Sequence, residues 1–178
     1  MRLSLAKNII VEGIKKNVAQ TLKKPITFHL EGSMGIGKTA LARQIAEDLG
    51  FYLVIVSLPQ LEPTDIGGMR MPKGDRMIVL QPDWYVDAEQ MAKLKAEGYK
   101  GVLYFFDELP QAPILNQNIY AQIADEYRIG DYKLDRTEWY VMSAGNKLSE
   151  KAGPNAMPSH VIDRLTFLEI EPNLFFFF

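Results

Sequence analysis

Apolar residues gather along the chain in short continuous runs, and stretches of helix-like spacing separate these runs. Five runs have the length of a buried strand, at residues 25–30, 51–57, 102–106, 139–143 and 165–170. Strands that are covered on both faces carry apolar residues at consecutive positions, so these runs predict parallel strands. The stretches between them predict helices at 40–49, 87–97 and 113–126. We therefore expect an α/β three-layer sandwich around a five-stranded, mostly parallel sheet.

Two further segments complete this organisation. Apolar residues recur at near-helical spacing from Leu5 to Leu22, which predicts an amphipathic helix that ends before Pro25. Alternating arms on either side of residues 72–75 predict a β-hairpin that projects from the core. We expect one core domain over residues 1–172, in which the hairpin at 67–81 is an insert.

An apolar tail at residues 173–178 follows this domain and ends in four phenylalanines. Four exposed phenylalanines would form an adhesive patch. We therefore expect the tail to be covered by this domain, by a neighbouring subunit or by further chain of a longer protein.

The composition is that of an ordinary globular protein, with 47% apolar and 24% charged residues. A formal net charge of −2 gives no electrostatic reason to expect bulk nucleic acid as a partner. Cysteine is absent, which excludes disulfides, thiol nucleophiles and thiolate metal sites. No apolar run reaches the roughly 18 residues of a membrane helix, and the N-terminus does not resemble a secretory signal. We therefore expect a cytoplasmic protein without a membrane partner.

The segment between the first strand and the helix at 40–49 carries the clearest chemistry. It matches the pattern G-x-x-x-x-G-K-[ST], which binds the phosphates of nucleoside triphosphates. Its glycines allow a tight turn that directs backbone N–H groups inward, and the next helix adds its positive N-terminal end. We expect Lys38 to reach the β- and γ-phosphates of ATP or ADP, and the Thr39 hydroxyl to bind Mg²⁺. The residues expected to hold the nucleotide are Gly32, Ser33, Met34, Gly35, Ile36, Gly37, Lys38, Thr39 and Ala40.

Polar residues follow the third and fourth strands, where a parallel sheet would bring them near this loop. We expect Asp107 to hold Mg²⁺ and Glu108 to accept a proton from the attacking water. Asn146 either orients that water or is a simple turn residue. Arg164 either acts on a nucleotide held by the next subunit or forms an ordinary ion pair. The expected catalytic set is Lys38, Glu108, Asn146 and Arg164.

The order of these elements resembles the AAA+ ATPases, and within them the MoxR and dynein-related branch. Residues 32–39 resemble the Walker A motif, 105–108 the Walker B motif, 143–146 the sensor-1 strand and 163–165 the arginine-finger segment. The resemblance covers about residues 5–170. It implies a ring-forming homo-oligomer, expected as a hexamer, that hydrolyses ATP to remodel a protein or nucleic-acid client. In such proteins the hairpin is an insert that faces the substrate in the ring pore.

The chain departs from the family pattern at its end, which leaves other functions open. Family members carry a C-terminal helical lid with a sensor-2 arginine, whereas this sequence stops after the fifth strand, so we expect no lid. A nucleotide-gated assembly module, which binds ATP with little turnover, would suit such a chain. A small P-loop kinase would need an arginine-rich lid, but the seven arginines here are scattered.

Of three smaller signals, two have both a structural and a functional interpretation. We expect His29 to be a packed or edge residue of the first strand. His160 either orients Arg164 or lies on a helix surface. The hairpin methionines either grip an unfolded substrate or cover the root of the hairpin, and they are Met69, Met71 and Met77.

Overall fold

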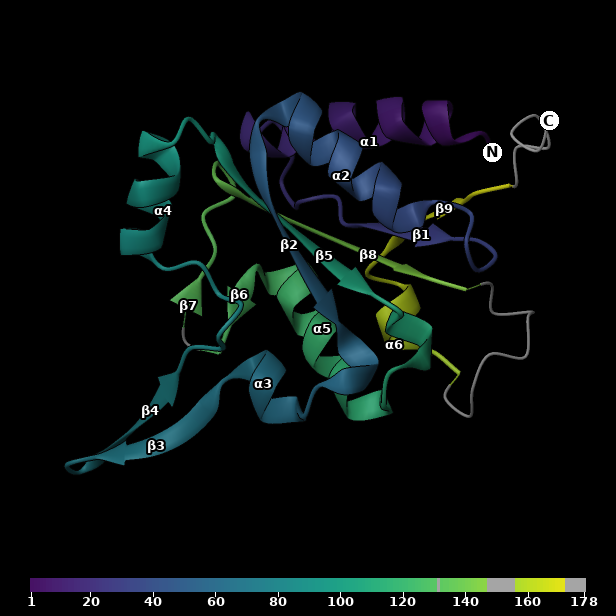
Figure 1. Cartoon of the computed structure of the whole chain (residues 1–178). Coiled ribbons are helices and arrows are strands. Elements are labelled where there is room, and N and C mark those ends of the chain that lie inside the picture. The colour runs from purple at the N-terminus through teal and green to yellow at the C-terminus, as the bar shows by residue number, and fades with distance from the viewer. Residues whose placement is uncertain (131, 147–155, 172–178) are drawn as a thin grey trace.

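The computed structural model describes residues 1–130, 132–146 and 156–171, and within them it confirms the predicted α/β sandwich (Figure 1). The central sheet has five strands, all parallel, in the order β2-β5-β8-β1-β9. Since parallel strands end on the same side, the segments after β1, β5 and β8 meet at one edge of the sheet. The strand bounds are β1 Phe28–Glu31, β2 Phe51–Ser57, β5 Gly101–Asp107, β8 Trp139–Gly145 and β9 Thr166–Glu169.

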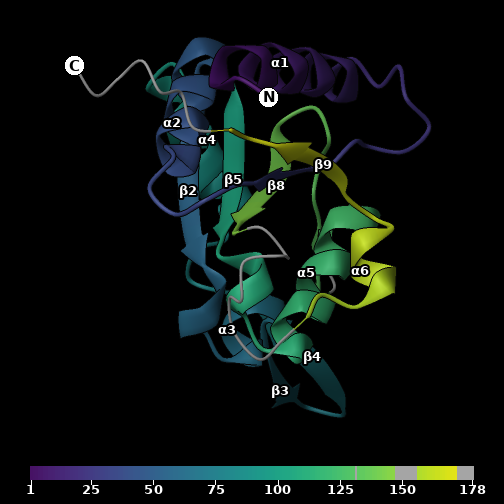
Figure 2. The same cartoon turned by 90° about the vertical axis from the view of Figure 1, so that its right-hand side faces the viewer.

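Helices cover both faces of this sheet (Figures 1 and 2). α1 and α2 lie on one face, and α5 and α6 lie on the other. α3 and α4 add Ile66 and Met91 to the core on the α5 side. The helix bounds are α1 Leu3–Val18, α2 Lys38–Leu49, α3 Pro63–Gly67, α4 Ala88–Ala96, α5 Ile114–Glu126 and α6 Ser159–Ile162, with short 3-10 turns η1 Leu58–Gln60 and η2 Leu109–Gln111.

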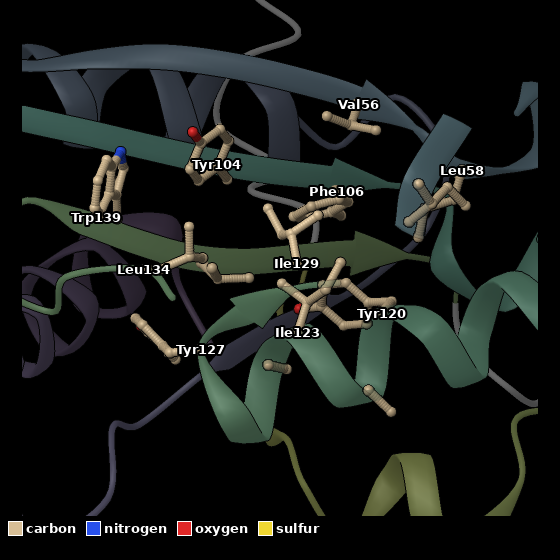
Figure 3. Close-up of a cluster of buried hydrophobic side chains, with 14 of the residues drawn as sticks. Val56, Leu58, Tyr104, Phe106, Tyr120, Ile123, Tyr127, Ile129, Leu134 and Trp139 are labelled. Atoms are coloured by element: carbon tan, nitrogen blue, oxygen red, sulfur yellow. The ribbon is translucent and has the colours of Figure 1, made fainter. Parts of the chain in front are cut away.

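The central strand β5 shows why the sequence has continuous apolar runs. Tyr104 and Phe106 belong to the core on the α5 side, while Leu103 and Phe105 belong to the core on the α1–α2 side. All four side chains are fully buried. Figure 3 shows the first of these cores, in which the rings of Phe106 and Tyr120 have centroids 5.0 Å apart. Burying such side chains contributes about 1.5–3 kcal/mol each, so β5 is a firm support for the residues at its carboxyl end.

The first helix is shorter than predicted, and only part of the predicted apolar face is turned to the core. It ends at Val18, and Leu5 and Ile9 are exposed. The side-chain amide of Asn17 donates to the carbonyl of Ile26 and accepts from its N–H, both at 3.0 Å. These bonds fasten the end of α1 to the segment before β1, so the chain leaves the helix early. The buried positions of α1 are Ala6, Ile10, Gly13, Ile14 and Asn17.

A β-hairpin projects from the sandwich where the alternating pattern predicts one. β3 (Met69–Lys73) pairs with β4 (Arg76–Leu80) in antiparallel fashion and points away from the sheet (Figure 1). Its three methionines are between 41% and 59% exposed. These methionines are Met69, Met71 and Met77.

A second, shorter hairpin is absent from the sequence prediction. It joins β6 (Arg128–Ile129) to β7 (Tyr132–Lys133), and two-residue arms give no alternation to detect. The predicted tail at 173–178 lies outside the described residues, in which β9 is the last element. None of the helices in the described ranges combines the length and the apolarity that crossing a membrane requires.

Candidate functional site

The loop between β1 and α2 turns back over the start of the helix. Gly35 and Gly37 have φ angles of 76° and 98°, a left-handed conformation that glycine adopts without steric cost. Gly37 directly precedes α2. The first N–H groups of this 12-residue helix have no partner within the helix, and they attract anions.

The loop borders a cavity of about 300 Å³ at the carboxyl edge of the sheet. The sheet contributes residues from the ends of β5 and β8, and the loop contributes its central part and the start of α2. Gly32, Ser33 and Arg164 are the predicted site residues that do not line the cavity. The lining residues are Met34, Gly35, Ile36, Gly37, Lys38, Thr39, Ala40, Asp107, Glu108, Gly145 and Asn146.

Lys38 is held at the base of the loop by oxygen atoms. Its side chain is 9% exposed, and its ammonium group donates to the carbonyls of Gly32 at 2.7 Å and Ser33 at 3.0 Å. A third contact, 3.4 Å long, joins Lys38 Nζ to Asn146 Oδ1. Because a buried ammonium group needs such acceptors, Gly32 and Ser33 serve the site by fixing Lys38.

Thr39 and Asp107 form the second element of the site. The Thr39 hydroxyl donates to Asp107 Oδ2 at 3.0 Å. The described residues contain no group of three or more His, Asp or Glu side chains that could hold a metal ion by themselves. Mg²⁺ commonly takes one or two carboxylates and completes its shell with water and substrate phosphates. The hydroxyl and carboxylate therefore suit a Mg²⁺ ion that arrives with a phosphate ligand.

Glu108 has an unusual backbone conformation. Its φ and ψ angles are 59° and 33°, a left-handed conformation that costs a non-glycine residue roughly 1–2 kcal/mol. Its N–H donates to Asp107 Oδ1 at 2.9 Å, and its Oε2 accepts from the Ser57 hydroxyl at 3.2 Å. Strained residues of this kind cluster at functional sites. The sequence prediction missed Ser57, whose only signal is that it ends an apolar run beside Asp107 in the sheet.

His29 was expected to be either a packed or an edge residue of the first strand, and the structure shows a packed residue of β1. It is fully buried, and its Nδ1 lies 2.8 Å from Ser143 Oγ on the neighbouring strand β8. Burial and, to a smaller extent, the positive charge of Lys38 lower the pKa of His29 to about 3. The imidazole is therefore neutral at physiological pH.

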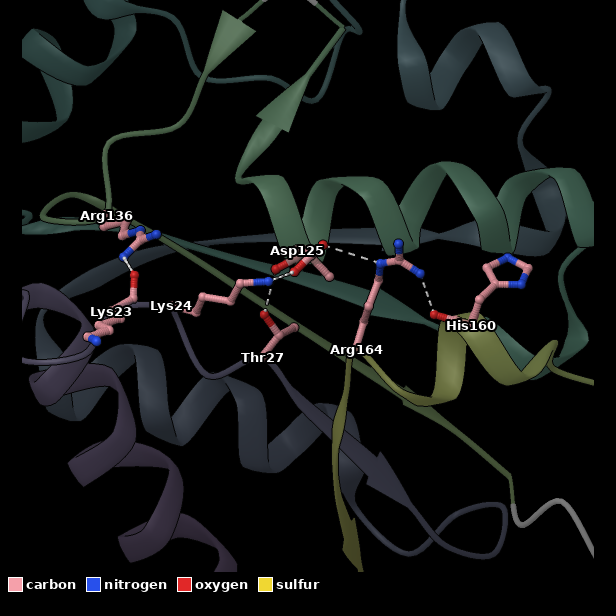
Figure 4. A network of polar contacts seen from close by, with 8 residues as sticks. Lys23, Lys24, Thr27, Asp125, Arg136, His160 and Arg164 are labelled. Atoms are coloured by element: carbon pink, nitrogen blue, oxygen red, sulfur yellow. Dashed lines mark hydrogen bonds and ion pairs between the residues drawn. The ribbon is translucent and has the colours of Figure 1, made fainter.

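Arg164 lies apart from the cavity, between α5 and α6 (Figure 4). Its Nε is 3.4 Å from Asp125 Oδ2, and its Nη1 donates to the carbonyl of His160 at 2.5 Å. Lys24 binds the other oxygen of Asp125 at 3.3 Å. The imidazole of His160 contacts Asn118 instead, so the backbone of His160, and not its ring, orients Arg164.

A slightly larger cavity, of about 350 Å³, lies between β2 and α4. Aromatic and aliphatic side chains such as Tyr52, Trp84 and Leu94 line much of it. None of the predicted site residues lines this cavity. A binding site also needs a few convergent polar groups, which a larger volume does not by itself provide. The cavity at the loop is therefore the better candidate for chemistry.

Comparisons with known proteins agree with this geometry. Residues 28–111 match the family described as ATPase family associated with various cellular activities (AAA), a segment that includes the loop, Asp107 and Glu108. A comparison with curated protein sequences found no match.

Two solved structures with similar folds are RuvB and Hsp104. Thermotoga maritima RuvB, as a P216G mutant, aligns with a TM-score of 0.56 and 16% identity over 96% of this chain and 46% of that one. Hsp104 in its closed state, with ATPγS and FITC-casein, aligns with a TM-score of 0.63 and 16% identity over 96% of this chain and 33% of that one. At this identity the likeness shows the fold alone, that of an AAA+ P-loop protein. The chain spans less than half the length of either protein.

Proposed function

We propose, from the match of residues 28–111 to the AAA family and from the cavity beside its loop, that this chain binds ATP with Mg²⁺ and hydrolyses it. One observation carries the proposal. A buried ammonium group, a hydroxyl–carboxylate pair and a second carboxylate line a single cavity, although they come from separate stretches of the sequence. Phosphoryl transfer from a nucleoside triphosphate uses this set of groups.

Each group has a role that its position supports. The loop N–H groups bind the phosphates, and Lys38 exchanges a carbonyl acceptor for a phosphate oxygen. Thr39 and Asp107 hold Mg²⁺, which when bound neutralises charge on the phosphates. Glu108 accepts a proton from water while the water oxygen attacks the γ-phosphorus and the bond to the ADP oxygen breaks. Asn146 orients the water or the γ-phosphate.

We extend the proposal to a ring homo-oligomer of the MoxR type, with six subunits. Lys38 is the only basic residue among those described as lining the cavity, and we propose that another chain supplies a second cation. Arg164 suits that role, since it does not reach the cavity of its own subunit. The hexamer and the cytoplasmic location stay predictions.

The client-binding element that we propose is the β3–β4 hairpin. It projects from the sandwich, and its exposed methionines are flexible apolar groups that adapt to varied surfaces. The Hsp104 structure contains casein, and by analogy we propose a protein client for this chain.

Glu108→Gln tests the assignment of the base. Since glutamine keeps the shape of the side chain but accepts no proton, we expect kcat to fall by about 10²–10⁴-fold while the Kd for ATP changes little. Phosphate release and equilibrium binding of labelled ATP measure the two quantities. Lys38→Ala is the control, in which binding itself should weaken about 10- to 100-fold. Unchanged steady-state turnover in Glu108→Gln would show that another group is the base.

A nucleotide-gated assembly module is the second candidate. It is favoured by the isolated position of Arg164, which leaves the cavity of one chain with a single basic residue in the described part. ATP-dependent oligomers without phosphate release would support this module over the hydrolase. The kinase alternative has no comparable support, because no arginine lines the cavity in the described residues.

A further inference from the structure

Two buried polar side chains lie beneath the site and join the strand before the loop to the strand before Asn146. His29 Nδ1 is 2.8 Å from Ser143 Oγ, and both residues are fully buried. They are direct partners in the parallel pairing of β1 with β8. Each lies three positions before a residue of the site, His29 before Gly32 and Ser143 before Asn146.

Lys38 contacts the residues that follow both of these strands. Its Nζ donates to the carbonyl of Gly32 at 2.7 Å and contacts Asn146 Oδ1 at 3.4 Å. The backbone at Gly145 lies close enough to His29 that an added Cβ would be 3.4 Å from the imidazole Cε1. If the imidazole moved, the displacement would reach Gly32 through β1 and Asn146 through β8. It would therefore disturb the contact between the Lys38 ammonium and the Asn146 amide from both strands.

Packing alone does not explain an imidazole at this position. The ring packs on Phe167 with centroids 5.0 Å apart, and its Nε2 has no hydrogen-bond partner among the described residues. Burying a polar atom without a partner costs free energy, which an aliphatic side chain of similar size would avoid. What the imidazole adds is the bond to Ser143.

We propose that His29 is a positioning residue for Asn146: through Ser143 it holds the end of β8 in the register at which the Asn146 amide meets Lys38 and the γ-phosphate. This inference rests on the proposed ATPase function. His29 does not line the cavity, so it acts through Ser143 and Asn146 and touches no reacting atom.

A double-mutant cycle tests the proposal. His29→Leu should lower kcat roughly tenfold and leave the KM for ATP within about twofold, since the amide acts on the transition state. The conservative variant His29→Asn, which keeps a polar atom near the position of Nδ1, should restore most of the rate. In an Asn146→Ala background, His29→Leu should have no further effect, because two residues that act as a unit are not additive.

The side-chain amide signals of Asn146 provide a readout that does not need activity. In the ¹⁵N-labelled, nucleotide-free chain, His29→Leu should shift or broaden these NMR signals, and His29→Asn should leave them near their wild-type positions. The inference would be overturned if His29→Leu lowered kcat equally in the wild-type and the Asn146→Ala backgrounds. It would also be overturned if His29→Leu left the Asn146 amide signals unchanged. A wild-type chain without ATP turnover would refute the proposed function alone, and the amide signals would then decide the inference.

Discussion

Glu108 combines an exposed carboxylate with a left-handed backbone, and its two hydrogen bonds explain how that conformation is held. Its N–H is bonded to the Asp107 side chain and its Oε2 to Ser57. A strain of roughly 1–2 kcal/mol is therefore offset by contacts to the ends of two neighbouring strands. In this conformation Glu108 lines the cavity, and strained residues of this kind cluster at functional sites.

His29 predicts a pH dependence of stability. Its folded pKa of about 3 lies below the ordinary value of 6.5. As pH falls from about 6.5 toward 3, the unfolded chain takes up a proton that the folded chain does not, so the free energy of unfolding falls by about 1.4 kcal/mol per pH unit. The contribution is fully present above pH 6.5.

Urea unfolding at pH 7 and pH 5 measures this effect. Wild type should lose about 2 kcal/mol more than His29→Asn between the two values. Equal losses in the two proteins would mean that the buried imidazole does not titrate as its surroundings imply.

Among single residues, the sequence predicted best where the chemistry depends on a local motif. Residues 32–39 and Asp107 are recognisable from their neighbours in the chain, and the cavity contains most of them. Ser57 and the bond between His29 and Ser143 depend on which strands lie side by side. Without the strand order, neither contact can be predicted.

At the scale of elements, strands were predicted better than the first helix. β5 and β8 are buried on both faces, so their apolar residues stand at consecutive positions in the sequence. α1 has one buried face, and the pattern selected Leu5 and Ile9, which are exposed, as well as Ile10 and Ile14, which are buried. The end of α1 depends on Asn17, which binds a residue nine positions further along, a contact that periodicity does not contain.

The contact between β8 and η2 predicts a sensitive glycine. A Cβ at Gly145 would lie 2.1 Å from Cδ and 2.5 Å from Cγ of the Pro110 ring, which is stiff and buried. We expect Gly145→Ala to lower the free energy of unfolding by about 1–3 kcal/mol through overpacking. Thermal unfolding should show a lower Tm, by roughly 2–4 °C per kcal/mol.

Gly67→Ala is the matched control. Its Cβ would meet Ile119 at 3.5 Å, an ordinary contact, and Gly67 is helical. It should be neutral or stabilise the fold by up to about 1 kcal/mol. Similar Tm values for the two variants would contradict the tight contact at Gly145.

For the whole molecule, the sequence predicted the layers and the sheet but not the surroundings of Arg164. The arginine was predicted as either an ion-pair residue or a group acting on another subunit, and the structure shows its ion pair with Asp125. Exposed pairs of this kind are worth up to about 1 kcal/mol. Such a contact is weak enough to exchange for a nucleotide phosphate, so the two roles are compatible.

Mixing variants tests whether subunits share a site. Arg164→Ala should bind ATP and hydrolyse it weakly, whereas Lys38→Ala should bind ATP only weakly and should not hydrolyse it. At equal amounts, Lys38→Ala subunits would supply Arg164 to their neighbours and restore about a quarter of wild-type activity by random assembly in a ring. Arg136→Ala, which removes a bond to the carbonyl of Lys23, should keep full activity. Absence of rescue at every ratio would argue against the shared site.

The central claim is that a nucleotide occupies the cavity between the loop and the ends of β5 and β8. Titration calorimetry of the folded chain with ATP or ADP in the presence of Mg²⁺ tests it most directly. We expect one nucleotide per chain, and Lys38→Ala should weaken binding about 10- to 100-fold, as the loss of a charge-assisted hydrogen bond of about 1.5–3 kcal/mol implies. Failure of the folded wild-type chain to bind either nucleotide at millimolar concentration would contradict the account.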